Sequence, residues 1–125
     1  MLPMDDLLIA RLVAAGRVLF GTLCFAVPRL ILGKHAKDAS GPLIWMVRAF
    51  GIRDVVLGAG ALVSLNEDDP DTSWVKFGAI ADTADAVAAV SFRDELGPAF
   101  TVATLSLAAP ASVLGWKAAI GLGKG

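Results

Sequence analysis

The sequence contains only one cysteine and one histidine, and this scarcity excludes several kinds of chemistry. Cys24 alone cannot form an intramolecular disulfide or a thiolate cluster, and between Leu23 and Phe25 it is typical of a small apolar filler. One histidine, His35, with scattered aspartates does not make a zinc site, and in its basic surroundings we expect it to be solvated. The sequence therefore predicts no metal site, no cofactor and no catalytic residue.

Charge is also scarce, which limits the classes of partner. Charged residues make up 18% of the chain, against about 25% in soluble proteins. The net charge of -1 provides no basic surface, so we exclude nucleic acid as a partner. The opening "MLPMDD" has no Lys or Arg before the first apolar run, so the basic start of a secretory signal peptide is missing and we expect the N-terminus to be retained.

Apolar residues dominate what is there. They make up 56% of the 125 residues, and the mean hydropathy is +0.68. The length suits one domain, and four apolar segments follow one another along it. Each is about as long as the 20 residues that one membrane crossing needs. We therefore predict an all-α fold, a bundle of four transmembrane helices forming one integral membrane domain over residues 1–125, with helices at about 7–27, 42–65, 74–92 and 99–120.

Several residues mark the ends of these segments. Pro28 ends the first, and the acidic stretch "NEDDPDTS" separates the second from the third as an exposed loop. The fourth has no charge between Glu95 and Lys117, which is the strongest single transmembrane signal, and a kink is expected at Pro110. Three tryptophans lie near segment ends, where we expect them at the lipid headgroups: Trp45, Trp74 and Trp116.

Membrane orientation is open from the sequence alone. The positive-inside rule compares Lys and Arg in the short loops on the two sides. One side has Arg29, Lys34, Lys37 and Arg93, and the other has Arg11, Lys76, Lys117 and Lys124. The two sides are therefore equal by this count.

A soluble helical bundle is the competing class. Charges that interrupt the first three segments favour it. However, the runs "VVLGAGALVSL" and "TVATLSLAAPASVLGW" carry no polar stripe at the helical period, as a soluble amphipathic helix would. These runs favour the membrane.

Six ionisable residues fall well inside the predicted spans. Unpaired, they would cost roughly 15–20 kcal/mol on insertion scales. Exposure of all six to lipid is untenable, so we predict a closed bundle in which they face inward and neutralise one another. The residues of this predicted polar cluster are Arg17, Arg48, Arg53, Asp54, Asp82 and Asp85.

Spacing constrains how the polar cluster is built. Asp82 and Asp85 are three residues apart and share a helix face, which Gly78 and Ala89 extend with small residues that allow close approach. Arg53 and its neighbour Asp54 lie about 100° apart on a helix, so they point to different places. Which arginine pairs with which aspartate stays open at this stage. Four hydroxyls are further candidates for bonds between helices: Thr83, Thr101, Thr104 and Ser106. We expect Gly58 and Gly60 to allow close packing of a neighbouring helix.

Three stretches together resemble small bacterial four-helix membrane proteins of unknown function that are DoxX-like in shape. They are "GRVLFGTLCFAVPRL", "RAFGIRDVVLGAGAL" and "ADTADAVAA", and the resemblance covers residues 9–120. It implies that the six charged residues named above occupy the polar positions of that family. It carries no activity over to this chain.

Two functions are consistent with these features. The first is a non-enzymatic accessory or scaffold subunit of a bacterial inner-membrane complex, a multi-pass protein whose polar cluster is an internal ionic lock. Its partners would be the lipid bilayer and either another protein or further copies of the chain. The alternative is a transporter or binder of a lipid-like or other apolar ligand, whose headgroup meets the same cluster. An intramembrane enzyme that uses Asp82 and Asp85 as acid and base is less favoured, because no nucleophile or metal site accompanies them.

Overall fold

The computed structural model describes residues 4–67 and 71–123, and every regular element in these two ranges is helical. This confirms the predicted all-helical fold, and the four long helices agree with the four predicted segments to within three residues at every boundary described by the structure. The elements are α1 (Met4–Ala26), α2 (Pro28–Leu32), the 3-10 helix η1 (Gly33–His35), α3 (Gly41–Leu65), α4 (Ser73–Ser91), α5 (Arg93–Leu96) and α6 (Pro98–Gly123).

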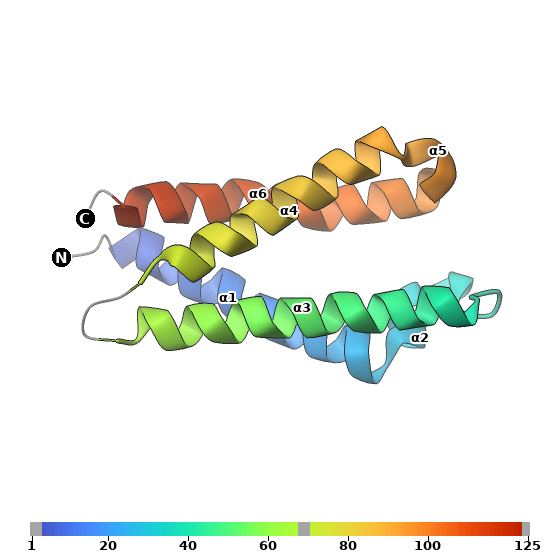
Figure 1. The fold of residues 1–125 in the computed structure, drawn as a ribbon, viewed down its shortest axis with the longest axis horizontal. Coiled ribbons are helices and arrows are strands. Elements are labelled where there is room, and N and C mark those ends of the chain that lie inside the picture. Colours follow the sequence, from blue (N-terminus) through green and yellow to red (C-terminus); the bar gives the residue numbers. More distant parts are fainter. Residues whose placement is uncertain (1–3, 68–70, 124–125) are drawn as a thin grey trace.

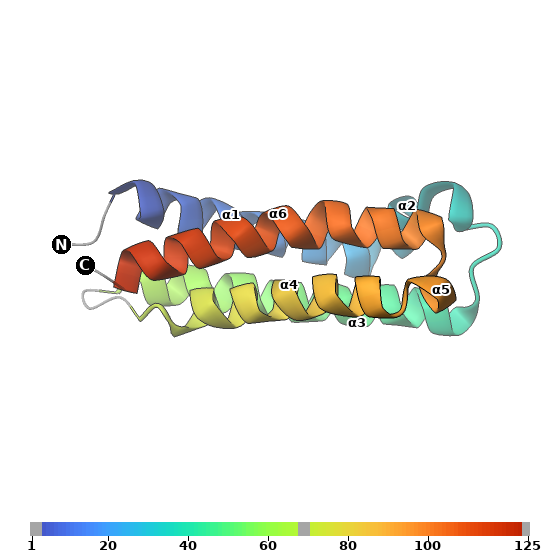
Figure 2. The ribbon, with the colours of Figure 1, turned by 90° about the horizontal axis from the view of Figure 1, so that it is seen from above.

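The four long helices lie side by side along the long axis of the molecule (Figures 1 and 2). Helices α1 and α3 form one closely packed pair and α4 and α6 form the other, and the pairs meet through α1 with α6 and α3 with α4. Successive helices run in opposite directions. Both ends of the described chain therefore lie at one end, together with the end of α3 and the start of α4, while α2, η1 and α5 lie at the other.

Local sequence explains where the helices begin and end. Helix α1 ends at Ala26, because a residue before proline disfavours helical geometry. Pro28 begins α2, where its missing N–H has no cost because the first N–H groups of a helix have no partner within the helix. The Ser40 side chain caps α3 by accepting a hydrogen bond from the Leu43 N–H at 3.2 Å. Gly97 supplies the positive φ of 87° between α5 and α6. The segments around Pro28 and Arg93, which we predicted as loops, thus contain short helices. Pro110 lies inside α6, which continues through it as one helix, and the kink there stays a prediction.

Glycines bring α1 and α3 into backbone contact. A Cβ on Gly21 or on Gly51 would collide with backbone atoms of the other residue's helix, and one on Gly58 would meet Ala14 and Val18 of α1. The prediction that Gly58 serves close helix packing is therefore confirmed. Gly60 also makes room for a neighbour, here the Trp74 indole ring of α4.

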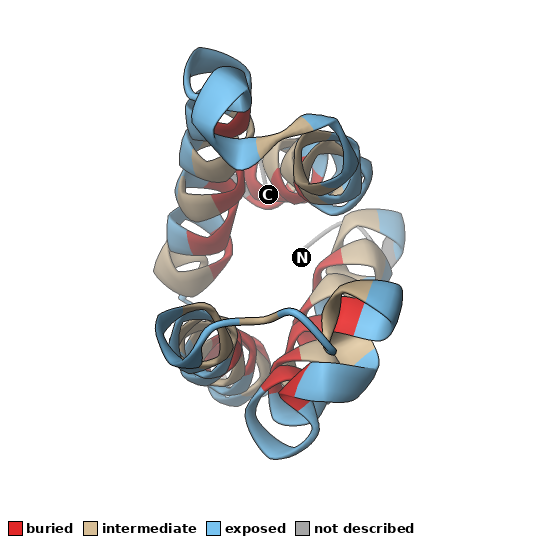
Figure 3. Cartoon of the chain, turned by 90° about the vertical axis from the view of Figure 1, so that its right-hand side faces the viewer, coloured by how far each residue is buried: buried red, intermediate tan, exposed pale blue. Residues whose placement is uncertain are grey.

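Small residues fill the interior and large apolar ones cover the outside. Alanine makes up most of the buried apolar residues, and each long helix also exposes large apolar residues. Figure 3 shows the buried positions turned toward the centre of the bundle and the exposed positions on its outside. Leu19, Val63, Val87 and Val102, one from each long helix, are between 60% and 66% exposed. Within the described residues, two helices are long and apolar enough, by length and composition, to cross a membrane: α1 over Asp5–Ala26 and α6 over Pro98–Leu122.

Part of the predicted acidic loop, residues 68–70, and the cation Lys124 lie outside the described residues.

Candidate functional site

The Arg17 side chain occupies the middle of the bundle. It extends from α1 toward α3 and α4 and is only 8% exposed. Gly78 of α4 makes this position possible, because a Cβ there would come within 2.9 Å of Arg17 Nη2. Gly78, which we predicted to admit a neighbouring helix, therefore admits a guanidinium group.

Two aspartates from two further helices meet this guanidinium. Arg17 donates from Nη1 to Asp54 Oδ1 of α3 at 3.3 Å and to Asp82 Oδ1 of α4 at 3.2 Å. It also donates from Nη2 to Asp82 Oδ2, which completes a two-pronged pair with Asp82. Both aspartates are 5% exposed. One arginine thus connects three of the four long helices through buried charges.

A second ion pair joins α3 and α4. Arg53 donates to both carboxylate oxygens of Asp85, at 3.2 Å from Nη1 and 2.6 Å from Nη2. Its guanidinium carbon lies 4.6 Å from the centroid of the Phe50 ring. The two side chains are 37% and 25% exposed, so this pair lies at the α3–α4 seam rather than in the centre. Arg53 Nε is buried without a hydrogen-bond acceptor.

The pairs follow the spacing argument. Asp82 and Asp85 share a face of α4 and each meets its own arginine, while Arg53 and Asp54 point to different partners, as their 100° separation requires. The sequence did not distinguish Arg17 from Arg53 as the partner of Asp82. The structure assigns Arg17 to it.

Arg48 does not join the other five residues. Its side chain is exposed, and Nε donates to the backbone carbonyl of Phe25 at 3.2 Å. Arg48 lies five residues before Arg53, about 140° away around α3. The last turn of α1 also leaves carbonyl groups without intrahelical partners, and a cation is favourable there. The prediction of Arg48 as a member of the polar cluster is therefore corrected. From here on, "the ionic network" means Arg17, Arg53, Asp54, Asp82 and Asp85.

A hydroxyl and indole cluster joins α4 to α6. Thr83 Oγ1 lies 2.7 Å from Ser112 Oγ and accepts a hydrogen bond from Trp116 Nε1 at 2.8 Å. Of the four hydroxyls that we predicted to link helices, only Thr83 does so among the hydrogen bonds of the described chain. Thr101 and Ser106 instead bond to carbonyls of their own helix. No sequence signal identified Ser112.

The tryptophans differ from the prediction. Trp116 turns inward, because its indole N–H finds an acceptor in Thr83. Trp74 packs against the buried core and lies over Gly60. Only Trp45 is largely exposed, as a headgroup position requires. His35 also differs from the expected solvated residue, since its ring is half-buried and lies 4.9 Å from that of Phe100.

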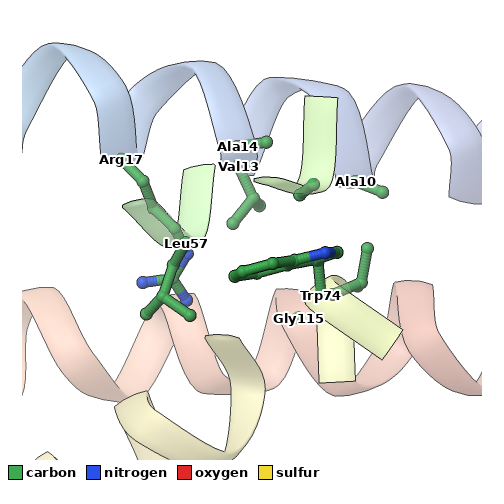
Figure 4. Close-up of a pocket in the computed structure, with 9 residues that line it drawn as sticks. Ala10, Val13, Ala14, Arg17, Leu57, Trp74 and Gly115 are labelled. Carbon is green, nitrogen blue, oxygen red and sulfur yellow. The ribbon is translucent and has the colours of Figure 1, made fainter. Parts of the chain in front are cut away.

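A small cavity lies beside the ionic network. Figure 4 shows the flat Trp74 ring between α1 and α6, with Arg17 and Leu57 to one side and Ala10 to the other. The cavity has room for about one water molecule. Within residues 4–67 and 71–123, no group of three or more His, Cys, Asp or Glu is arranged to hold a metal ion.

One end of the bundle carries two further polar contacts between helices. Lys117 of α6 donates to Asp6 of α1 at 3.1 Å, and Arg11 of α1 donates to Asn66 at 3.1 Å. These contacts join neighbouring helices at the end that holds the described termini.

Comparison of the chain with protein families, with curated proteins and with solved structures gave no match.

Proposed function

We propose that the chain is a four-helix integral membrane protein that acts as a non-enzymatic accessory or scaffold subunit of a bacterial inner-membrane complex. The observation that carries this proposal is the contrast between the inside and the outside of one bundle. A buried ionic network joins α1, α3 and α4, while the outward faces of all four long helices are apolar.

Helices α3 and α4 have the length needed to cross beside α1 and α6. At 1.5 Å per residue, their 25 and 19 residues extend about 38 Å and about 28 Å, close to the roughly 30 Å hydrocarbon core. Helices α3 and α4 differ from α1 and α6 in the number of charged residues in their central turns. The charges in their central turns, Arg53, Asp54, Asp82 and Asp85, all have partners inside the network or along its seam.

The surface composition supports placement in lipid. Apolar residues are exposed on α1, α3, α4 and α6 alike, whereas a soluble bundle would turn polar faces outward. The resemblance to DoxX-like membrane proteins is consistent with this placement.

The geometry of the network favours a lock. Asp82 and Asp85 receive both prongs of an arginine, which leaves those guanidinium edges unavailable to a ligand headgroup. The cavity beside Arg17 holds about one water molecule, far less than a lipid tail requires. These features support the scaffold over the alternative of a transporter or binder of a lipid-like ligand.

Two experiments test the proposal. The first measures whether Asp82→Ala accumulates in membranes, with Asp71→Asn in the exposed loop as the matched control. We expect strong loss of the Asp82 variant alone, because Arg17 keeps one weak partner. Folded Asp82→Ala protein at normal membrane levels would refute the lock.

The second experiment identifies companions. The wild-type protein is purified in mild detergent, and its proteins and lipids are measured by mass spectrometry. The scaffold predicts a protein companion at fixed stoichiometry. A stoichiometric lipid with no protein companion would instead support the ligand-binding alternative, and soluble wild-type protein that needs no detergent would refute membrane insertion.

A further inference from the structure

The ionic network has one more acidic group than basic groups. Arg17 and Arg53 supply two positive charges, whereas Asp54, Asp82 and Asp85 supply three negative ones. The six predicted residues balanced, but the structure removes Arg48 from them. With all five remaining groups ionised, the network carries a net charge of -1.

No other cation in the described part of the chain forms an ion pair with the network, since Arg48 of α3 donates to the Phe25 carbonyl and Arg11 of α1 donates to Asn66. From α1, the neighbouring titratable group is the Cys24 thiol, which is neutral or negative and never positive. Helix α6 has no charged residue between Pro98 and Trp116. Its Lys117 pairs with Asp6 near the end of the bundle. On α4, the remaining cation is Lys76, which is exposed in the first turns of the helix.

The three carboxyl groups differ in how they are held. Both oxygens of Asp82 accept from Arg17, and both oxygens of Asp85 accept from Arg53. Asp54 accepts a single hydrogen bond, at 3.3 Å, from a nitrogen that it shares with Asp82. Asp54 Oδ2 has no donor among the described residues, although it is not one of the fully buried atoms left without a partner, as Arg53 Nε is. Asp54 is nevertheless among the most buried polar residues, in the α1–α3 seam against Gly21.

We propose that Asp54 is a proton-binding site and carries its proton in the folded protein at neutral pH. A buried carboxylate with one shared hydrogen bond loses its hydration without adequate replacement, and such a group neutralises instead. A proton on Asp54 makes the network neutral while both two-pronged pairs stay ionised. This inference rests on the proposed membrane bundle, in which lipid rather than bulk water surrounds the α1–α3 seam.

The proton also makes the lock sensitive to pH. The folded chain binds one proton that an unfolded, solvated Asp54 releases at neutral pH. Stability therefore falls as pH rises, because the folded state binds more protons than the unfolded state. Loss of the proton leaves an uncompensated negative charge beside Arg17, and Arg17 must then divide its hydrogen bonds between two carboxylates.

Infrared spectroscopy reads the protonation directly. Wild-type protein in lipid nanodiscs at neutral pH is compared with Asp54→Asn, which has nearly the shape of a protonated aspartate. The expected result is a carboxylic acid C=O band in the wild type that is lost in Asp54→Asn. Asp38→Asn, at an exposed loop residue, is the matched control and keeps the band.

Every outcome decides the question. A wild-type spectrum without the band at neutral pH overturns the proposal, and this measurement needs no variant to fold. A band that survives in Asp54→Asn also overturns it, because another group then holds the proton. Thermal unfolding provides a second test, in which the melting temperature of the wild type falls between neutral and alkaline pH and that of Asp54→Asn falls less.

Failure of this inference is distinct from failure of the proposed function. A protein that inserts into membranes and has the expected companion but lacks the band would refute the proton site alone. A protein that remains soluble without detergent would refute the membrane placement, whatever its infrared spectrum shows.

Discussion

The two ion pairs of this bundle use the same chemistry in different surroundings. Arg17 and Asp82 are 8% and 5% exposed at the meeting point of three helices. Arg53 and Asp85 are several times more exposed, lie at the seam of two helices, and have the Phe50 ring as a further neighbour. Both aspartates are held by two prongs. The difference therefore lies in burial and in how many helices each arginine joins.

This comparison shows what each pair contributes. A buried charge that loses its partner stays desolvated, which destabilises the fold by the full desolvation free energy. A partly exposed charge moves toward the surface and regains part of its hydration. We therefore expect Arg17 to determine whether the bundle forms, and Arg53 to adjust how α3 and α4 meet. Removing each group in turn tests this ranking.

The largest effect is expected for Arg17→Ala. It leaves the ionised Asp82 buried without a cation and removes the hydrogen-bond donor of Asp54, at a cost of about 3–5 kcal/mol, which is enough to prevent accumulation of the protein. The measurement is the amount of folded protein in membranes and its thermal unfolding in detergent. Arg48→Ala is the matched control, because Arg48 is an arginine outside the network. Equal stability of the two variants would contradict the central role of Arg17.

A smaller effect is expected for the pair at the seam. Asp85→Ala removes two hydrogen bonds to a charged group, and we expect a loss of about 1.5–3 kcal/mol. A double-mutant cycle with Arg53→Ala measures the coupling between the two residues. The cycle is completed by the double variant Arg53→Ala with Asp85→Ala. The exchanged pair Arg53→Asp with Asp85→Arg is a separate variant, which we expect to recover part of the loss. A loss for Asp85→Ala as large as that for Arg17→Ala would reverse the ranking of the two sites.

The uncharged link between α4 and α6 is expected to matter less than either pair. Thr83→Val keeps the shape of the side chain and removes the hydroxyl that Ser112 and Trp116 contact. Hydrogen bonds between membrane helices contribute about 0.6 kcal/mol on average and about 1.7 kcal/mol at most. Thermal unfolding in detergent measures the change, and Thr101→Val, whose hydroxyl bonds within its own helix, is the control. A cost above that of Asp85→Ala would show that hydroxyls rather than charges hold these helices.

The sequence was sufficient for the helices and for most of the network. Apolar runs bounded by Pro28 and by charged turns gave the four long helices, and residue spacing placed Asp82 and Asp85 on one face. These features depend on neighbours along the chain, so local patterns predict them. That all four helices cross a membrane stays a prediction and is part of the proposed function. Helices α3 and α4 carry charges in their central turns, and local sequence does not show whether these charges have partners.

The errors came from contacts between distant segments. Arg48 has the same residue type and nearly the same setting as Arg53, yet the end of α1 provides a carbonyl acceptor that no local pattern reveals. Trp116 was placed at the headgroups because of its position near a segment end. Its inward direction depends on Thr83, 33 residues earlier in the chain. In both cases a free hydrogen-bonding group on another helix decided the outcome.

The smallest effect is expected at a carboxylate that lies outside both pairs. Hydrogen bonds from the Ser73 side chain and from its backbone N–H, the latter at 2.9 Å, hold the pKa of Asp71 below its ordinary value. A lowered pKa means that any stabilisation is present at neutral pH and is lost only as pH falls through that lowered pKa. Ser73→Ala keeps the backbone donor and removes the hydroxyl, so the pKa of Asp71 should rise partway toward its ordinary value. A carboxyl NMR titration measures this shift, with Asp38 as an exposed reference.

Because Asp71 is fully solvated, its titration should leave the melting temperature nearly unchanged, whereas the network loses stability when Asp54 is deprotonated. A melting temperature that followed Asp71 would show that the exposed loop, rather than the buried pairs, limits the stability of the bundle.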